Sequence, residues 1–262
     1  MKRLVVIKGA GDIATGIAHR LFRSGFRVVM TDLPRPTAIR RTVAFATAIF
    51  EGGVEVEGVE AVCTDPAGAL EAVESRRIPV AVDPTGLTVK TLKPWAVVDA
   101  ILAKKNLGTR LNDAPVVIGV GPGFTAGLDV HMVVETKRGH YLGRVITDGQ
   151  AFPSTGEPGM IEGFTHERIL RAPCEGVFRA VRKIAESAAA GDILAYVDGQ
   201  PVTAQISGVI RGLLHDGLQV HSRMKIGDID PRGLTEYCFT ISDKARAVAG
   251  GVLEALLMRY DE

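Results

Sequence analysis

The sequence has few aromatic residues and few cysteines. Aromatic side chains make up 5% of the 262 residues, so the chain offers few platforms on which single-stranded nucleic acid could stack. The formal net charge is +1, and a broad basic surface for nucleic acid is therefore not expected. The three cysteines, Cys63, Cys174 and Cys238, are odd in number and far apart, which argues against a disulfide framework or a zinc ribbon. We expect no nucleic-acid partner.

Long apolar runs are also missing. No stretch approaches the length of a membrane span, and a core strand is expected within the first few residues, which leaves no room for a secretory signal. With 46% hydrophobic and 23% charged residues, the composition is that of an ordinary globular protein. We therefore expect a cytoplasmic protein that does not contact a membrane.

The beginning of the chain carries the strongest pattern. An apolar run at residues 4–7 leads into Gly9, Gly11 and Gly16, which predicts a buried strand, a glycine turn and a helix. Gly9 and Gly11 would allow the tight turn and close backbone approach that a phosphate requires. Asp32 ends the next apolar run, about twenty residues beyond Gly11, where a carboxylate can accept hydrogen bonds from ribose hydroxyls. The pattern predicts a Rossmann-like domain that binds a nucleotide.

Asp12 does not fit this pattern well. It places a negative charge at the start of the predicted helix, where a pyrophosphate would otherwise bind. Asp12 could cap the helix, bind a cation or exclude the phosphate, and the sequence leaves these alternatives open. Moreover, a glycine-rich first strand–helix unit also occurs in parallel-sheet domains that bind no dinucleotide.

A second glycine loop follows the apolar run at residues 115–118. We expect it to form the other half of the ligand site. Its candidate binding residues are Gly121, Gly123, Phe124, Thr125 and Gly127.

Acidic and imidazole side chains offer weaker candidates. Asp83 ends a short buried run, where it could face a ligand or organise the turn before a proline. His131, Glu135 and His140 could hold a metal ion, but their spacing matches no established ligand pattern, so we favour a hydrogen-bonded polar face. No acid/base pair such as Tyr-x-x-x-Lys stands out, so the catalytic and metal-binding residues stay unknown.

The second half of the chain has a different character. Glycines and prolines at residues 151–165 indicate a linker or loop, and the short strands beyond it resemble the small β-sandwich of biotinyl and lipoyl carrier domains. Where a carrier has its modifiable lysine, this chain has residues 198–201 (DGQP). Asp228, Asp230 and Arg232 could bind a ligand, but we favour a structural ion-pair turn.

These patterns predict an α/β fold. A Rossmann-like parallel-sheet domain at residues 1–150 would bind the nucleotide or cofactor, and a β-rich, barrel-sandwich, carrier-like module would follow at 166–234. Residues 235–262 would add a strand and a helix, capped by Ser242, that pack on the rest.

Several motifs together resemble a known bacterial family. They are residues 8–16 (KGAGDIATG), 40–45 (RRTVAF), 121–127 (GPGFTAG), 129–131 (DVH), 135–140 (ETKRGH), 208–212 (GVIRG), 225–232 (KIGDIDPR) and 242–247 (SDKARA). They resemble the YqeB family, accessory proteins of selenium-dependent molybdenum hydroxylases, and the resemblance covers nearly the full length.

The resemblance implies a role in enzyme maturation. A maturation factor would hold NAD, another nucleotide or the phosphate tail of a molybdopterin-type cofactor in its two glycine loops while docking on a client hydroxylase. The distantly similar xanthine dehydrogenase accessory proteins carry a glycine-rich cysteine motif, which this chain lacks, so Cys63 is the one thiol whose reactivity we would test. The alternatives are an NAD-dependent oxidoreductase and a non-catalytic scaffold that binds the client. The chain could also form a homo-oligomer, and its oligomeric state is left open.

Overall fold

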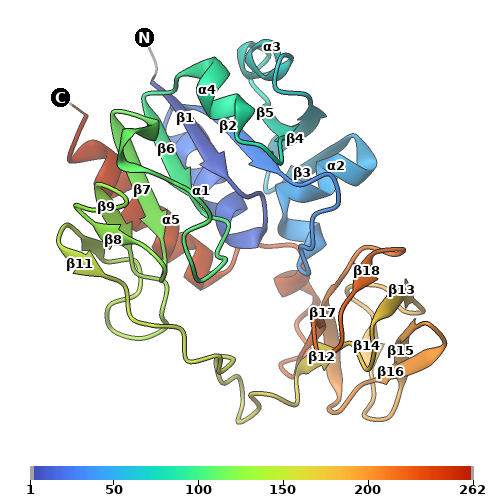
Figure 1. The fold of residues 1–262 in the computed structure, drawn as a ribbon. Coiled ribbons are helices and arrows are strands. Elements are labelled where there is room, and N and C mark those ends of the chain that lie inside the picture. The colour runs from blue at the N-terminus through green and yellow to red at the C-terminus, as the bar shows by residue number, and fades with distance from the viewer. Residues whose placement is uncertain (1–2, 261–262) are drawn as a thin grey trace. The chain divides into compact units, whose positions relative to one another are not determined.

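The computed structural model describes residues 3–260, which divide into two compact units (Figure 1). Unit 1 holds the residues up to 36, residues 44–155 and the residues from 241 onward. Unit 2 holds residues 37–43 and 156–240. The helix near the C-terminus thus belongs to unit 1, and a short segment from the first part of the chain belongs to unit 2.

Unit 1 is built on a nine-stranded sheet in the order β10-β9-β7-β6-β1-β2-β5-β4-β3. The pairs from β9 to β4 are all parallel, and β10 and β3 add an antiparallel strand at each edge. The strands are β1 (Leu4–Lys8), β2 (Arg27–Asp32), β3 (Gly53–Val56), β4 (Val59–Thr64), β5 (Ile78–Val82), β6 (Ala96–Asp99), β7 (Val116–Val120), β9 (Met132–Val134) and β10 (Val145–Ile146). A separate pair joins β8 (Thr125–Ala126) to β11 (Gly149–Gln150).

Two longer helices pack together in unit 1, while the other helical segments of the described chain are short. Ile13, Ile17 and Leu21, each one turn apart along α1, form an apolar stripe, and all three are buried. Helix α5 packs alongside α1 and against β7, β9 and β10, and the Ser242 hydroxyl caps it. The α-helices are α1 (Asp12–Arg23), α2 (Ala48–Glu51), α3 (Ala69–Glu74), α4 (Leu87–Leu92) and α5 (Asp243–Leu257), and the 3₁₀ turns are η1 (Arg41–Val43), η2 (Phe45–Thr47), η3 (Leu111–Asp113) and η4 (Thr235–Cys238).

The prediction of a Rossmann-like parallel-sheet domain was wrong. The sheet is mixed, and β5 lies between β2 and β4, so the strands do not follow one another outward from β1 as in a doubly wound domain. The chain crosses from β6 to β7 with only the turn η3, and from β7 to β9 through β8, so these crossovers lack the α-helix that such a fold places between parallel strands. The apolar run and glycine turn specify the first strand and helix but not the crossovers that define the fold.

Unit 2 consists mainly of two four-stranded antiparallel sheets. Phe178, Leu194 and Ile210 are among its fully buried side chains. A two-residue turn at Asp198 and Gly199 joins the strand that ends at Val197 to the strand that begins at Gln200. One sheet contains β12 (Ile169–Arg171), β19 (Lys225–Asp230), β17 (Gly208–Leu213) and β14 (Ser187–Ala188), and the other β16 (Gln200–Thr203), β15 (Ile193–Val197), β13 (Gly176–Ala180) and β18 (Gln219–Val220).

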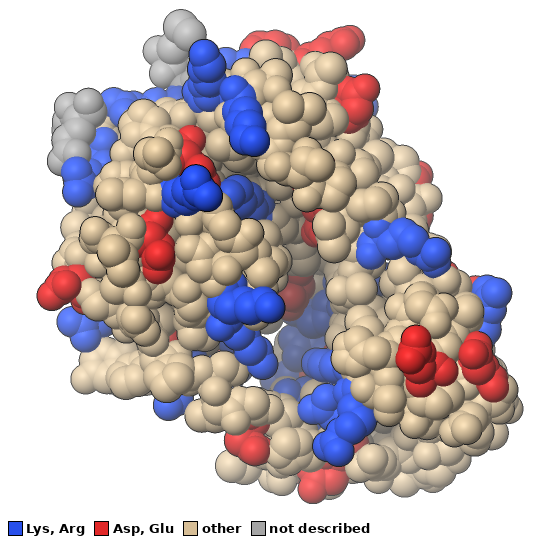
Figure 2. Space-filling view, viewed as in Figure 1, with Lys and Arg blue, Asp and Glu red and all other residues tan. Residues whose placement is uncertain are grey.

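The surface shows no large field of one charge on the face that Figure 2 presents. Lys and Arg side chains are interspersed with Asp and Glu, in keeping with the net charge of +1. Among residues 3–260, no helix has both the length and the apolar character needed to cross a membrane.

Candidate functional site

The first glycine turn lies at the carboxyl end of β1. Gly9 has a φ of +93°, and its N–H donates to the Thr31 carbonyl oxygen at 2.8 Å. A Cβ on Gly9 would lie 2.9 Å from the Ala100 carbonyl oxygen. Glycine is therefore required here by the backbone conformation and by the segment that follows β6.

Asp32 holds this turn in place. One carboxylate oxygen accepts the Ala10 N–H at 2.8 Å, and the other accepts the Leu33 N–H at 2.8 Å. Burial raises the pKa of Asp32, and the two backbone hydrogen bonds offset only part of that rise. The carboxylate that the sequence assigned to a ribose thus accepts hydrogen bonds from the backbone of the glycine turn and of the residue that follows it in the chain.

The start of α1 has empty space beside it. Gly11 occupies the N-cap position with an extended backbone (φ −68°), and no side chain caps the helix. A Cβ on Gly11 would meet no atom within 4 Å. The first backbone N–H groups of a helix have no partner within it and its dipole favours negative charge, so this helix start is a candidate anion site. Asp12, the first residue of α1, carries a negative charge that would repel a bound anion.

Lys244 supplies a positive charge near this helix start. It lies in the first turn of α5 and is half-buried. Burial lowers its pKa, with a further decrease from Arg138, while Asp12, Glu135 and Asp243 raise it; the net change is downward. Within residues 3–260, the Lys244 ammonium donates no hydrogen bond and forms no ion pair. A cation close to Asp12 is therefore available to a bound anion.

The sequence reasoning missed Lys244 as a site residue. A signal was present, because residues 242–247 form one of the motifs that resemble the YqeB family. The motif lies far along the chain, however, and only the packing of α5 against α1 brings the two helix starts together.

Gly16 has a different role from the one predicted. It lies one turn into α1, where a Cβ would come within 2.8 Å of the Ala245 Cβ and 3.2 Å of the Ile241 Cγ2. Its small size lets α1 and α5 approach each other closely. Gly16 therefore faces a helix and not the open space at Gly11.

The second glycine loop is filled by the protein itself. A Cβ on Gly121 would lie 2.7 Å from the Thr136 hydroxyl, and one on Gly123 would lie 2.7 Å from the Lys105 Cα. Phe124 is buried, and its ring occupies the space that a side chain at Gly119 would take. These residues pack the loop against neighbouring backbone and core.

Thr125 and Gly127 complete the loop as a turn. The Thr125 N–H donates to the Asp129 carboxylate at 2.9 Å, and its hydroxyl accepts from the Gln150 amide at 2.8 Å. Gly127 has a φ of +81°, and its N–H donates to the Val130 carbonyl oxygen at 2.8 Å. The polar groups named here have partners within unit 1.

The two glycine loops flank one segment. Strand β6 lies between β1 and β7, and residues 100–105, which follow β6, contact Gly9 on one side and Gly123 on the other. Both loops are at the carboxyl edge of the sheet, but the chain itself runs between them.

The candidate metal ligands have other partners. The His131 Nδ1 accepts the Val117 N–H at 3.0 Å, in the tautomer that this geometry requires. Glu135 accepts three backbone N–H groups, including that of Phe152 at 2.8 Å. His140 packs edge-on against Tyr141. Within residues 3–260, no group of three or more His, Cys, Asp or Glu side chains is arranged to hold a metal ion.

Asp83 organises the turn that leads into α4. Its carboxylate accepts the N–H groups of Thr85, Leu87 and Thr88 and the Thr85 hydroxyl, at 2.6–3.1 Å. Although burial alone would raise it, these hydrogen bonds lower the pKa of Asp83 to about 2. The turn-forming alternative for Asp83 accounts for these contacts.

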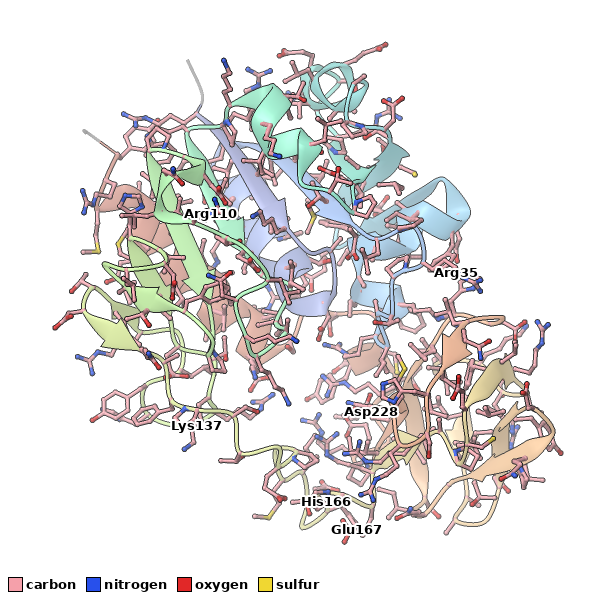
Figure 3. The ribbon with its side chains drawn as sticks, in the orientation of Figure 1. Arg35, Arg110, Lys137, His166, Glu167 and Asp228 are labelled. Atoms are coloured by element: carbon pink, nitrogen blue, oxygen red, sulfur yellow. The ribbon has the colours of Figure 1, made fainter. Side chains whose placement is uncertain are left out.

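In unit 2, the acids of β19 form ion pairs. Arg232 binds both carboxylate oxygens of Asp230, at 2.8 and 2.6 Å. The buried Asp228 (Figure 3) pairs with Arg168 at 3.0 Å.

Cys63, in unit 1, is half-buried, and burial raises its pKa, which disfavours the reactive thiolate.

Comparison with known proteins relates this chain to one close relative. It is 53% identical over 257 residues, or 98% of its length, to YqeB of Escherichia coli (strain K12), an uncharacterized protein. The chain belongs to the YqeB family. It spans about half the length of this relative, 48%. No family model matches the chain.

Solved structures show only distant similarity. An aspartoacylase family protein from Mesorhizobium loti matches with a TM-score of 0.27 and 8% identity, over 87% of this chain and 85% of the other. The ectoine utilization protein EutE (DoeB) from Ruegeria pomeroyi matches with a TM-score of 0.26 and 13% identity, over 87% and 85% of the two chains. Similarity at this level supports no conclusion about function.

Proposed function

We propose that unit 1 binds a nucleotide or a phosphorylated pterin cofactor at the start of α1, and that the chain serves as an accessory factor in the maturation of a selenium-dependent molybdenum hydroxylase. The observation that supports ligand binding is the open, uncapped helix start at Gly11, with the half-buried Lys244 nearby. The maturation half is supported by the motifs shared with the YqeB family.

The recognition chemistry is that of a phosphate. The first backbone N–H groups of α1 would donate hydrogen bonds to its oxygens, and the Lys244 ammonium would offset the charge of Asp12. The bound anion would in turn raise the pKa of Lys244, since an opposite charge favours the protonated amine.

Gly11 provides the sharpest test of this proposal. Its Cβ direction is open and its φ is ordinary, so Gly11→Glu should fold while placing a carboxylate where the phosphate would bind. Calorimetric titration with NAD, ATP, CTP, CDP and molybdopterin species should find saturable binding of at least one of them to the wild type. Gly11→Glu should weaken that binding by at least about tenfold, roughly 1.4 kcal/mol, and the matched control Gly11→Ala should bind within about threefold of the wild type. If the wild type binds none of these ligands, the proposal that unit 1 binds a nucleotide or a phosphorylated pterin is wrong.

One observation favours a second candidate, a scaffold that binds the client without a small ligand. Gly9, Gly16, Gly121 and Gly123 all contact neighbouring parts of unit 1 closely enough to explain why they are glycine. Activation of the client hydroxylase by Gly11→Glu separates the two candidates. Full activation would support the scaffold, and lost activation by a folded variant would support ligand binding. Gly123→Glu is unsuitable for this purpose, because its Cβ would collide with the Lys105 backbone.

A further inference from the structure

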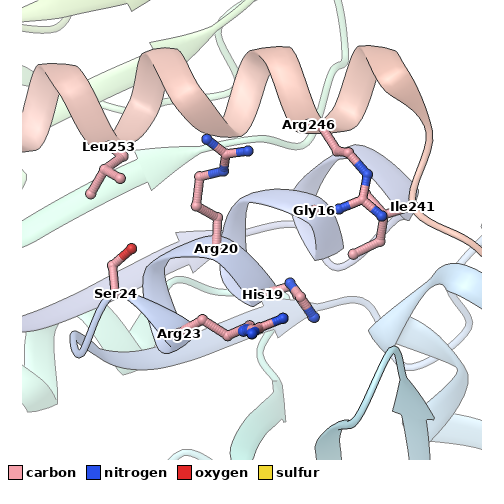
Figure 4. Close-up of a pocket in the computed structure, with 8 residues that line it drawn as sticks. All are labelled: Gly16, His19, Arg20, Arg23, Ser24, Ile241, Arg246 and Leu253. Atoms are coloured by element: carbon pink, nitrogen blue, oxygen red, sulfur yellow. The ribbon is translucent and has the colours of Figure 1, made fainter.

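A second feature of unit 1 lies on the other half of α1. A surface cavity of about 290 Å³ opens between α1 and α5, and its lining includes Arg20, Arg23 and Arg246 (Figure 4). Arg20 lies nine residues beyond Gly11, which corresponds to roughly 14 Å along the helix axis. Arg20 and Arg23 are therefore more than two turns from the open helix start, while Gly16 lies at the end of the cavity nearer to it.

Two of these arginines carry uncompensated charge. Arg20 is half-buried and Arg23 is exposed, and within the described part of the chain neither side chain makes an ion pair or a hydrogen bond. Arg246 is bound by the Glu57 carboxylate through contacts of 2.7 and 2.9 Å, and Glu57 also accepts the Ile241 N–H. The only carboxylate with a described contact to a lining arginine is thus already engaged.

The packing of the two helices directs these side chains into the cavity. Arg20 extends from α1 toward α5, and Arg246 extends from α5 toward α1 (Figure 4). Gly16, which lines the cavity, allows the helices to approach, and the guanidinium of Arg20 lies 3.4 Å from where a Cβ on Gly250 would be. A residue other than glycine at Gly16 would separate the helices and alter the cavity.

Arginines in the last turn of a helix also stabilise it through the helix dipole. That effect requires only that the charges lie near the helix end. It does not account for a half-buried guanidinium with no partner inside a cavity, because desolvating a charge is costly unless an opposite charge or hydrogen-bond acceptor compensates. An anionic ligand would supply both.

We propose that this cavity is a binding site for a small molecule that carries a phosphate or diphosphate group, held by Arg20 and Arg23. A planar guanidinium donates two parallel hydrogen bonds to two phosphate oxygens, a geometry that lysine cannot reproduce. The volume of about 290 Å³ is at the lower end of the range for small-molecule sites, which fits a compact phosphorylated ligand.

Inorganic pyrophosphate is a suitable probe, and Gly11→Glu is a suitable background because it blocks the site at the start of α1. In that background, NMR titration should shift the backbone amide signals of Gly16, Ser24 and Leu253 in a saturable manner. Arg20→Gln should weaken binding by at least tenfold, and the double variant Arg20→Gln/Arg23→Gln should show no saturable shift. Arg77→Gln removes the same charge from an exposed position elsewhere in unit 1 and should change the affinity by less than twofold.

The results separate this proposal from the proposed function. Saturable shifts in the Gly11→Glu background that disappear in the double variant support a cavity site whether or not a nucleotide binds at Gly11. Unchanged pyrophosphate affinity in a folded double variant, or no shift at the cavity residues in any variant, overturns the proposal. A thermal melt of each variant shows whether it is folded.

Discussion

The two glycine loops of unit 1 look alike in sequence but differ in structure. Each follows a buried strand and ends at the same edge of the sheet. At Gly11 a side chain would enter empty space, whereas at Gly123 it would collide with the backbone of residue 105. The two loops therefore differ in the surroundings of the missing Cβ, which are empty at Gly11 and filled by the protein at Gly123.

The largest expected effect is at the filled loop. Gly123→Ala forces a positive φ of 111° on an alanine and places its Cβ 2.7 Å from the Lys105 Cα. We expect a loss of about 3 kcal/mol in the free energy of unfolding, from backbone strain and overpacking together. Urea denaturation measures it, and a loss below about 1 kcal/mol would show that the two loops are not different in the way described.

A smaller loss is expected where α1 and α5 pack. Gly16→Ala brings a Cβ within 2.8 Å of the Ala245 Cβ but imposes no unfavourable φ. Overpacking should destabilise unit 1 by about 1–3 kcal/mol, partly offset by the higher helix propensity of alanine. Thermal unfolding of Gly16→Ala beside Gly250→Ala, a helix position with more room, provides the measurement and its control. Equal melting temperatures would contradict the packing role of Gly16.

Asp83 extends the comparison to the acids at the edge of the sheet. Asp83→Ala removes the carboxylate that binds three backbone amides, which should cost about 1–2 kcal/mol at pH 7. The native pKa of about 2 lies below the ordinary value of 3.8, so this contribution is complete above pH 3.8 and disappears as the pH falls through 2. Urea denaturation of both proteins between pH 7 and pH 2 should show the difference shrinking at low pH. A difference that does not depend on pH would contradict the role of the ionised carboxylate.

The smallest effect is expected at the open turn. Gly11→Ala adds a Cβ that meets no atom within 4 Å at an ordinary φ. The entropy that alanine removes from the unfolded chain and its poorer fit at an N-cap oppose each other, so stability should change by less than about 0.5 kcal/mol. A loss above about 1.5 kcal/mol in urea denaturation would mean that the space at Gly11 is not open.

Local patterns allowed the sequence to predict individual elements. The helix after Gly11, the cap at Ser242 and the buried run that ends near Asp83 are all present, because periodicity and capping depend on neighbouring residues. Residues 41–51 form two short 3₁₀ turns and one helical turn, and residues 37–43 belong to unit 2.

Long-range packing set the limit of prediction at the site. Nothing in residues 9–16 or 121–127 reveals that the segment after β6 fills the space between the loops. The position of Lys244 near the start of α1 depends likewise on how α5 packs, about 230 residues further along the chain. The glycine spacing predicts the turn after the first strand but not which glycine faces open space.

A crystal structure of the protein with a ligand from the nucleotide and molybdopterin panel tests the central claim most directly. The account predicts a phosphate group within hydrogen-bond distance, about 3 Å, of the first backbone N–H groups of α1 and of the Lys244 Nζ. A phosphate bound instead within residues 121–127, or a ligand that leaves the helix start at Gly11 empty, would contradict it.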